Sequence, residues 1–141
     1  MTITCLDSNI ILALRFKEAH AAALAEVLDS LSEIMVCGPI VAELSPRDLY
    51  AEEWLIDNGI QIDWNLNRPV WRRVAELHRE HALRQKKSGG GAPRRVVTDY
   101  LIGAHAEING YNLFTLNKRD YRFFSDLQLI TLRGDPNGTE Q

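Results

Sequence analysis

The stretch TITCLDSN at residues 2–9 decides how the rest of the chain is interpreted. Its first part, Thr2 to Leu6, is a short run of apolar and β-branched side chains, which is typical of a buried strand. Asp7, Ser8 and Asn9 follow directly, and all three residue types are favourable helix N-caps. We therefore expect a strand that passes straight into a helix at the start of the chain.

The same alternation continues to the end of the chain. Further strands are predicted at residues 34–37, 59–64, 112–116 and 127–132, and helices at 10–14, 18–32, 38–44, 47–57, 67–85 and 98–109. Strands that alternate with helices imply parallel pairing. The expected fold is an α/β three-layer sandwich with a central, mostly parallel five-stranded sheet.

One domain accounts for nearly all of the 141 residues. It is expected to span residues 1–133. Residues 86–95 contain several glycines among basic residues, which predicts a flexible basic loop inside this domain. Residues 134–141 are predicted to be a disordered polar tail.

Composition favours a soluble cytoplasmic protein. Hydrophobic residues make up 45% and charged residues 25% of the chain, and no apolar run approaches the roughly 18 residues that cross a bilayer. The N-terminus has no signal peptide pattern, so we expect no membrane association. The net charge of −3 argues against a simple electrostatic nucleic-acid binder, but not against an enzyme whose acidic site holds cations. Cys5 and Cys37 are interpreted as small buried hydrophobic residues.

Four acidic residues fall where a parallel sheet binds ligands, beyond the carboxyl ends of its strands. Asp7 follows the first predicted strand, and Asp120 follows the fourth. Glu43 lies on the helix after the second strand, and Asp99 lies in the first turn of the helix that leads to the fourth. We expect the four carboxylates to converge on one pocket.

Carboxylates packed together repel one another unless a cation lies between them. Oxygen ligands favour Mg²⁺ or Mn²⁺, and the histidines show no zinc-type spacing with the cysteines. Each acid also has a simpler explanation on its own. Asp7 and Asp99 could cap helices, Glu43 could be a surface residue and Asp120 a turn residue.

Four segments resemble, in order, the motifs of PIN-domain nucleases: LDSNII (6–11), VAEL (41–44), VTDYLIGAHA (97–106) and LFTLNKRDY (113–121). The resemblance covers nearly the whole chain, and the length is similar to that of the small bacterial toxins called VapC. It implies that Asp7 and Asp99 are the main metal ligands and that Glu43 completes the site directly or through water. Asp120 would bind a second ion or orient water.

The resemblance further implies that Ser8, Thr115 and Asn117 orient these carboxylates by hydrogen bonding. Two positions depart from the family pattern. Thr98 stands where many relatives have alanine, and the neutral Asn117 supplies no charge to a second metal ion.

The function implied by the resemblance is Mg²⁺- or Mn²⁺-dependent endoribonuclease activity, as the toxin of a toxin–antitoxin pair. RNA is the implied substrate, and a small antitoxin protein and a second copy of the chain, in a homodimer, are the implied partners. Basic residues at the rim of the pocket would guide the RNA; the candidates are Arg15, Lys17, Lys118, Arg119, Arg122 and the loop at 86–95.

Two alternatives keep the same fold: a catalytically silent PIN-fold binding module, and an RNA-processing nuclease without a toxin role. Two other acidic-pocket folds fit poorly. A response-regulator receiver needs adjacent acids after the first strand and a lysine after the fifth, and a haloacid-dehalogenase hydrolase needs aspartate where this chain has Asn9.

Overall fold

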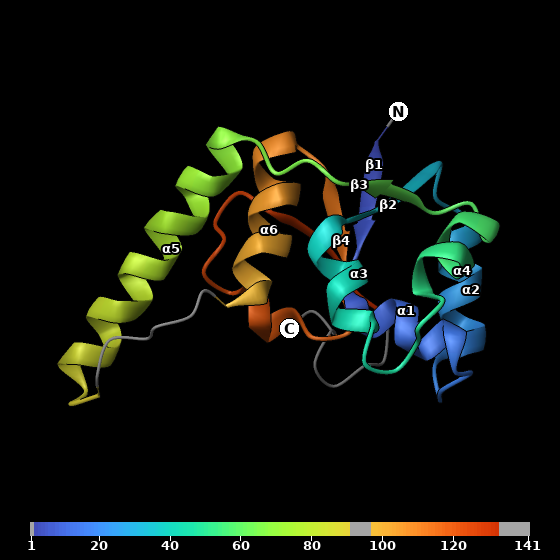
Figure 1. Ribbon diagram of the computed structural model, residues 1–141, viewed down its shortest axis with the longest axis horizontal. Coiled ribbons are helices and arrows are strands. Elements are labelled where there is room, and N and C mark those ends of the chain that lie inside the picture. Colours follow the sequence, from blue (N-terminus) through green and yellow to red (C-terminus); the bar gives the residue numbers. More distant parts are fainter. Residues whose placement is uncertain (1, 91–96, 133–141) are drawn as a thin grey trace.

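The computed structural model describes residues 2–90 and 97–132. Its centre is a five-stranded sheet in the order β3-β2-β1-β4-β5, in which every pair of neighbours is parallel (Figure 1). The strands are β1 (Ile3–Leu6), β2 (Glu33–Cys37), β3 (Gln61–Asp63), β4 (Asn112–Phe114) and β5 (Gln128–Ile130). The predicted five-stranded parallel sheet is confirmed.

β1 occupies the middle of this sheet. Its Cys5 is in register with Met35 of β2 on one side and with Leu113 of β4 on the other. Thr4, Cys5 and Leu6 are all buried, as expected for a central parallel strand that is covered on both faces. The order of the strands reverses at β1, because the chain builds β2 and β3 on one side of it and β4 and β5 on the other.

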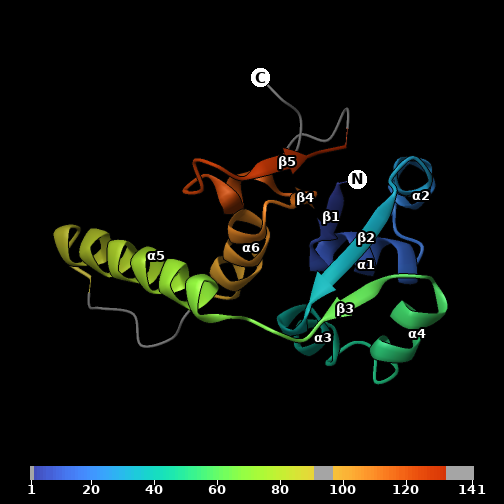
Figure 2. The ribbon, with the colours of Figure 1, turned by 90° about the horizontal axis from the view of Figure 1, so that it is seen from above.

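Helices cover both faces of the sheet. α6 (Thr98–Asn109), with α5 (Arg68–Lys87) packed outside it, lies on one face, and α1 (Ser8–Arg15), α2 (Ala21–Asp29) and α4 (Ala51–Asp57) lie on the other (Figure 2). The short α3 (Gly38–Leu44) follows β2, and one 3-10 turn, η1 (Lys118–Tyr121), follows β4. This arrangement is the predicted three-layer sandwich.

The sequence located the helix starts well where a side chain caps the backbone. Asp7 caps α1, with its carboxylate accepting from Ser8 N, and Asn67 caps α5, with its side chain accepting from Val70 N at 3.2 Å. Both positions satisfy N–H groups that the helix itself leaves without partners. Gly110 ends α6 with φ of 72°, a left-handed conformation that glycine adopts without strain.

Several predicted boundaries were wrong. Residues 47–50 are turns and not helix, because the Asp48 side chain accepts a hydrogen bond from Tyr50 N and holds a local turn. α2 is shorter than the predicted 18–32, and β1, β3, β4 and β5 are shorter than predicted, whereas β2 begins one residue earlier than predicted, at Glu33. α5 runs through Lys86 and Lys87, so the predicted loop begins too early. Residues 91–95 of that loop and the predicted tail at 134–141 lie outside the described residues.

A close contact sets the distance between α6 and the segment after η1. A Cβ atom on Gly103 of α6 would lie 2.4 Å from the ring of Phe124, so only glycine permits this approach. The helix that carries Asp99 therefore packs directly on the segment that follows Asp120.

The two cysteines, Cys5 and Cys37, are free and buried, as expected. Among the described residues, no helix combines the length and apolar character that a bilayer crossing needs.

Candidate active site

Asp7 lies at the centre of the candidate site, directly beyond the carboxyl end of β1. It is only 3% exposed, and its backbone N–H extends the β1–β4 pairing by donating to Phe114 O at 2.9 Å. One carboxylate oxygen accepts from Ser8 N, and the other accepts from the Thr115 hydroxyl, each at 2.8 Å. Asp7 therefore sits at the point where the strand order reverses, which is the usual ligand site of an open parallel sheet.

A second layer of hydrogen bonds fixes Thr115. Asn117 donates its backbone N–H to the Thr115 hydroxyl at 3.0 Å, so this residue takes part through its main chain. The Asn9 amide lies 3.4 Å from both Asp7 Oδ2 and Thr115 Oγ1, and its oxygen accepts from Leu116 N at 3.1 Å. Asn9 thus ties α1 to the chain after β4. The sequence indicated Asn9 only as a helix cap, although its place two residues after Asp7 made this second role possible.

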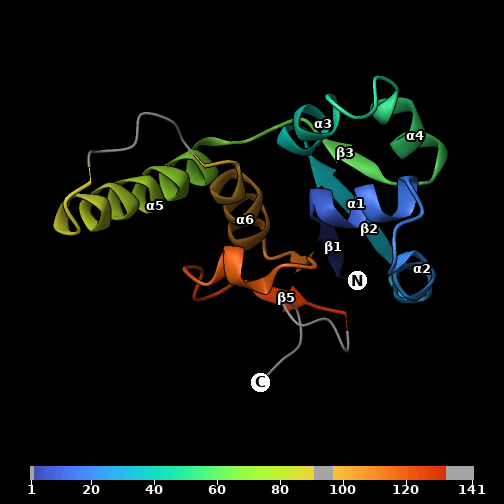
Figure 3. The ribbon, with the colours of Figure 1, turned by 90° about the horizontal axis from the view of Figure 1, so that it is seen from below.

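The other three carboxylates reach the same place from three further elements. Glu43 comes from α3, Asp99 from the first turn of α6 and Asp120 from η1. Figure 3 shows α3 and α6 next to the junction of β1 and α1. The negative charges of Asp120, Asp7 and Glu43 all act on Asp99, and Asp7 in turn acts on Glu43. The structure therefore brings the four predicted acids together.

This gathering changes the proton affinity of the acids. Burial, reinforced by the charges of Asp120, Asp7 and Glu43, raises the pKa of Asp99 from 3.8 to about 7. Burial also raises the pKa of Asp7, although hydrogen bonding by Thr115 opposes the shift. Burial likewise raises the pKa of Glu43, and the charge of Asp7 raises it further. Acids that burial and mutual repulsion disfavour in their charged form, as here, favour a bound cation.

Tyr121 is a functional candidate that the sequence did not single out. Its side chain is 1% exposed, and its hydroxyl makes no well-formed hydrogen bond to any other described residue. The hydroxyl nevertheless lies close enough to Asp7 and Asp99 to lower the pKa of both carboxyls. Burying a hydroxyl without a hydrogen-bond partner costs free energy. The Tyr121 hydroxyl would therefore gain a hydrogen bond if either carboxylate moved toward it. Its only sequence signal was its position directly after Asp120.

The donor set fits a hard divalent cation, since it consists of carboxylate and hydroxyl oxygens. Within residues 2–90 and 97–132, however, no three His, Cys, Asp or Glu side chains lie close enough to hold one ion among them. Four negative charges repel one another at short range, so a cation would have to draw the carboxylates inward. Asp7 is buried and held by three donors, whereas Asp99 is only partly buried, so an inward movement by Asp99 would break fewer contacts.

A cavity of about 290 Å³ opens beside the acids, between the end of α5, the start of α6 and η1. Asp99 and Asp120 line it on the acidic side. Residues that oppose them include Arg84 and Arg122, together with the ring of Phe123. Among the predicted guiding residues, Arg122 lies in this cavity, whereas Arg15 is bound to Asp48 at 2.9 Å. Arg84 was not among the predicted guiding residues, although it lies near the end of the predicted helix at 67–85.

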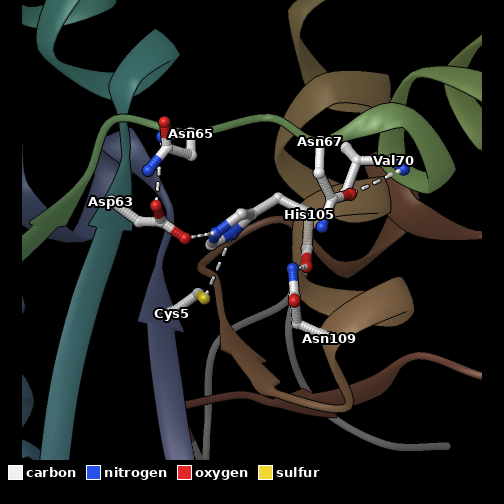
Figure 4. A network of polar contacts seen from close by, with 7 residues as sticks. All are labelled: Cys5, Asp63, Asn65, Asn67, Val70, His105 and Asn109. Carbon is white, nitrogen blue, oxygen red and sulfur yellow. Dashed lines mark hydrogen bonds and ion pairs between the residues drawn. The ribbon is translucent and has the colours of Figure 1, made fainter.

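A separate polar network lies on the α6 side of the sheet (Figure 4). The fully buried His105 contacts Asp63 Oδ2 through Nε2 at 2.9 Å and Cys5 Sγ through Nδ1 at 3.6 Å. Asn65 N donates to the other oxygen of Asp63 at 3.0 Å. Burial opposes ionisation of Asp63, but its hydrogen bonds with His105 and Asn65 outweigh burial and lower its pKa.

The Cys5–His105–Asp63 network contains the residue types of a cysteine-nucleophile site, but its cysteine lacks the properties of a nucleophile. Cys5 is 2% exposed, and burial raises the pKa of its thiol. A reactive cysteine needs access and a low pKa. The contacts instead join β1, the end of β3 and α6, and we interpret them as a structural link.

Known structures share this fold. VapBC2 from Rickettsia felis, solved bound to a DNA fragment from its promoter, aligns with a TM-score of 0.64 and 19% identity over 93% of this chain and 99% of that one. VapBC-1 from nontypeable Haemophilus influenzae aligns with a TM-score of 0.65 and 20% identity, over 92% of this chain and 98% of that one. A toxin–antitoxin complex from Klebsiella pneumoniae aligns with a TM-score of 0.61 and 16% identity, over 92% of this chain and 98% of that one. At these identities the likeness concerns the fold.

A search of curated proteins by sequence finds no match. The family described as "PIN domain" matches residues 4–126, a range that includes Asp7, Glu43, Asp99 and Asp120. This match covers most of the chain and agrees with the order of the four motifs. The chain therefore belongs to the PIN domain family.

Proposed function

We propose that the chain is an endoribonuclease that hydrolyses RNA with the help of Mg²⁺ or Mn²⁺ and acts as the VapC-type toxin of a toxin–antitoxin pair. The observation that carries the proposal is the convergence of Asp7, Glu43, Asp99 and Asp120, because burial together with the charges of the other three acids raises the pKa of Asp99 to about 7. Such mutual repulsion is unfavourable for folding. Its presence at the ligand-binding edge of the sheet is therefore best explained by a cation-dependent reaction.

Each acid has a distinct part in this proposal. Asp7 and Asp99 hold the cation, and Glu43 completes its shell directly or through water. Asp120 holds a second ion or orients the attacking water. The hydrogen bonds of Ser8 N and the Thr115 hydroxyl to Asp7 keep this carboxylate in one orientation. A bound divalent cation would favour ionisation of the attacking water and offset the charge on the reacting phosphate.

The structural likeness supports the proposal of a protein partner. The similar structures include VapBC complexes, and the corresponding partner of this chain would be a small antitoxin protein. We further propose that the chain forms a homodimer in the cytoplasm. Co-expression with an antitoxin encoded by a small gene beside this one should relieve growth arrest caused by this chain and yield a complex that co-purifies.

The nuclease proposal is tested by incubating labelled RNA with the purified chain and Mg²⁺, Mn²⁺ or EDTA. Cleavage is expected with either metal, none in EDTA, and none by the Asp99→Asn variant. Asp57→Asn is a matched control, because Asp57 is an exposed aspartate on α4. Cleavage that persists in EDTA would refute the proposal, and RNA that binds but stays intact with both metals would support the silent binding module.

A further inference from the structure

We propose that Arg84, Phe123 and Arg122 form a phosphate-binding subsite that holds the RNA backbone beside the reacting phosphodiester. The inference rests on the proposed function, since it concerns the substrate of the same site. It assigns to the three residues a positioning role, and it identifies the cavity between α5 and η1 as the path of the RNA strand.

The two guanidinium groups are held against one aromatic ring. Arg84 Cζ lies 4.1 Å and Arg122 Cζ lies 4.3 Å from the centre of the Phe123 ring. Arg122 also donates through Nη1 to Arg119 O at 2.8 Å. Attraction between a guanidinium and the face of a ring reduces the freedom of the arginine side chain. The stack therefore presents two ordered positive charges from two different segments of the chain.

These charges remain available for an anion. In the part of the chain that the structure describes, the ion pairs involve other arginines or His105, and neither Arg84 nor Arg122 lies within 4.0 Å of a carboxylate oxygen. Yet Asp99 and Asp120 line the same cavity. A guanidinium that stacks through its face keeps its N–H groups at the edge, where they can bind two oxygens of one phosphate.

The position of the stack explains how an acidic pocket could accept a polyanion. Four carboxylates repel a phosphodiester, so binding needs positive charge nearby. The stack shares its cavity of about 290 Å³ with two of the acids, Asp99 and Asp120, so a strand that crosses the cavity would meet these acids with one phosphate and the stack with another. The edge-to-face pair of His81 and Tyr100, whose ring centres lie 6.1 Å apart, contributes further to the lining.

The test measures binding of a fluorescent single-stranded RNA oligonucleotide in EDTA, which removes cleavage from the readout. Arg84→Gln and Arg122→Gln should each weaken binding by about three- to tenfold. Each should also reduce the magnitude of the negative slope of log K against log [KCl] by roughly 0.7, the value for one phosphate contact to a single strand. Arg79→Gln is the control, since Arg79 is exposed on the same helix and its substitution removes the same charge.

Phe123→Leu tests the ring separately from the charges. It keeps an apolar side chain but removes the surface on which both guanidiniums stack, so we expect weaker RNA binding with both arginines still present. In cleavage assays with Mg²⁺, the arginine variants should raise KM more than they lower kcat, because they act on binding and not on the reacting atoms. Circular dichroism confirms that each variant is folded.

The outcomes separate this inference from the proposed function. Arg84→Gln and Arg122→Gln proteins that bind RNA like the Arg79→Gln control would overturn the inference, even if the chain cleaves RNA. Weaker binding with an unchanged salt slope would also overturn it, because it would indicate contact with bases and not with phosphate. A chain that never cleaves, but whose stack variants lose binding as described, would leave the inference standing while the proposed function fails.

Discussion

Two groups of polar residues, one around Asp63 and one around Asp99, lie near the carboxyl edge of the sheet and behave in opposite ways. Asp63 ends β3 and accepts hydrogen bonds from His105 at 2.9 Å and from Asn65 N at 3.0 Å, which lower its pKa. Asp99, by contrast, faces burial and three other carboxylates, which raise its pKa to about 7. The charged form of aspartate is thus stabilised in the first group and destabilised in the second.

From this difference we propose that the Cys5–His105–Asp63 network serves the fold and that the acid cluster serves the proposed reaction. A satisfied network such as Cys5–His105–Asp63 adds to stability and specifies one packing arrangement. A cluster of like charges reduces stability, and it persists where a ligand completes it. We therefore expect substitutions in the acid cluster to abolish activity and spare the fold, and substitutions in the network to do the reverse.

The largest expected effect is that of Asp99→Asn. It should lower kcat for RNA cleavage by at least about 100-fold, because it removes a cation ligand. In EDTA the variant should be at least as stable as the parent chain, since one of four repelling charges is gone. Urea unfolding and a cleavage assay on the same preparation test both halves, and a clear loss of metal-free stability would argue that Asp99 is structural.

His105→Leu tests the opposite side of the comparison. It should lower the free energy of unfolding by about 1–3 kcal/mol, because Asp63 loses a hydrogen-bond partner next to the core. Cleavage per folded molecule should stay within about twofold. Urea denaturation gives the stability, and a specific activity that falls 100-fold in a folded variant would contradict the division between the two groups.

Tyr121→Phe should have a smaller effect and separate metal binding from folding. The hydroxyl has no settled partner among the described residues, so its loss should leave metal-free stability unchanged or slightly higher. If the hydroxyl orients Asp7 or Asp99 around a cation, its loss should weaken Mn²⁺ binding by roughly tenfold. Equal Mn²⁺ affinity in the variant and the parent chain would remove Tyr121 from the site.

The smallest expected effect is a dependence of stability on pH with opposite signs in the two groups. The folded-state pKa of Asp99 is raised above its usual 3.8 to about 7, so its ionisation costs stability above pH 7, and this cost fades as pH falls from about 7 toward 4. The pKa of Asp63 is lowered, so its contribution is present above the ordinary aspartate range and disappears as pH falls through the folded-state value.

Urea midpoints in EDTA between pH 5 and 8 measure this difference. The parent chain should gain stability relative to Asp99→Asn as pH falls, whereas it should keep a constant advantage over Asp63→Asn across that range. Parallel curves for the parent chain and Asp99→Asn would contradict the raised pKa.

The sequence predicted the sheet and the gathering of the acids because both depend on local patterns. Alternating strands and helices imply a parallel sheet, and residues placed directly after strands must meet at one edge. Asp7 and Asp120 could therefore be placed from their neighbours alone. Glu43 and Asp99 needed one further step, since each lies on a helix whose start is fixed by such an edge.

The parts that the sequence missed depend on contacts between distant segments. His105 and Asp63 are 42 positions apart, and nothing in either neighbourhood indicates that they pair. The Arg84–Phe123 contact likewise joins the end of α5 to the residues after η1. The predicted loop began too early because its lysines precede several glycines, yet they satisfy the last turn of α5, where basic residues are favourable.

The most direct test of the comparison is calorimetric titration of Mn²⁺ into the parent chain, Asp99→Asn and Asp63→Asn. We predict saturable binding by the parent chain, at least tenfold weaker binding by Asp99→Asn, and unchanged binding by Asp63→Asn. Equal binding by all three proteins, or by the parent chain and Asp99→Asn, would show that the converging acids do not hold the cation and would contradict the proposed function.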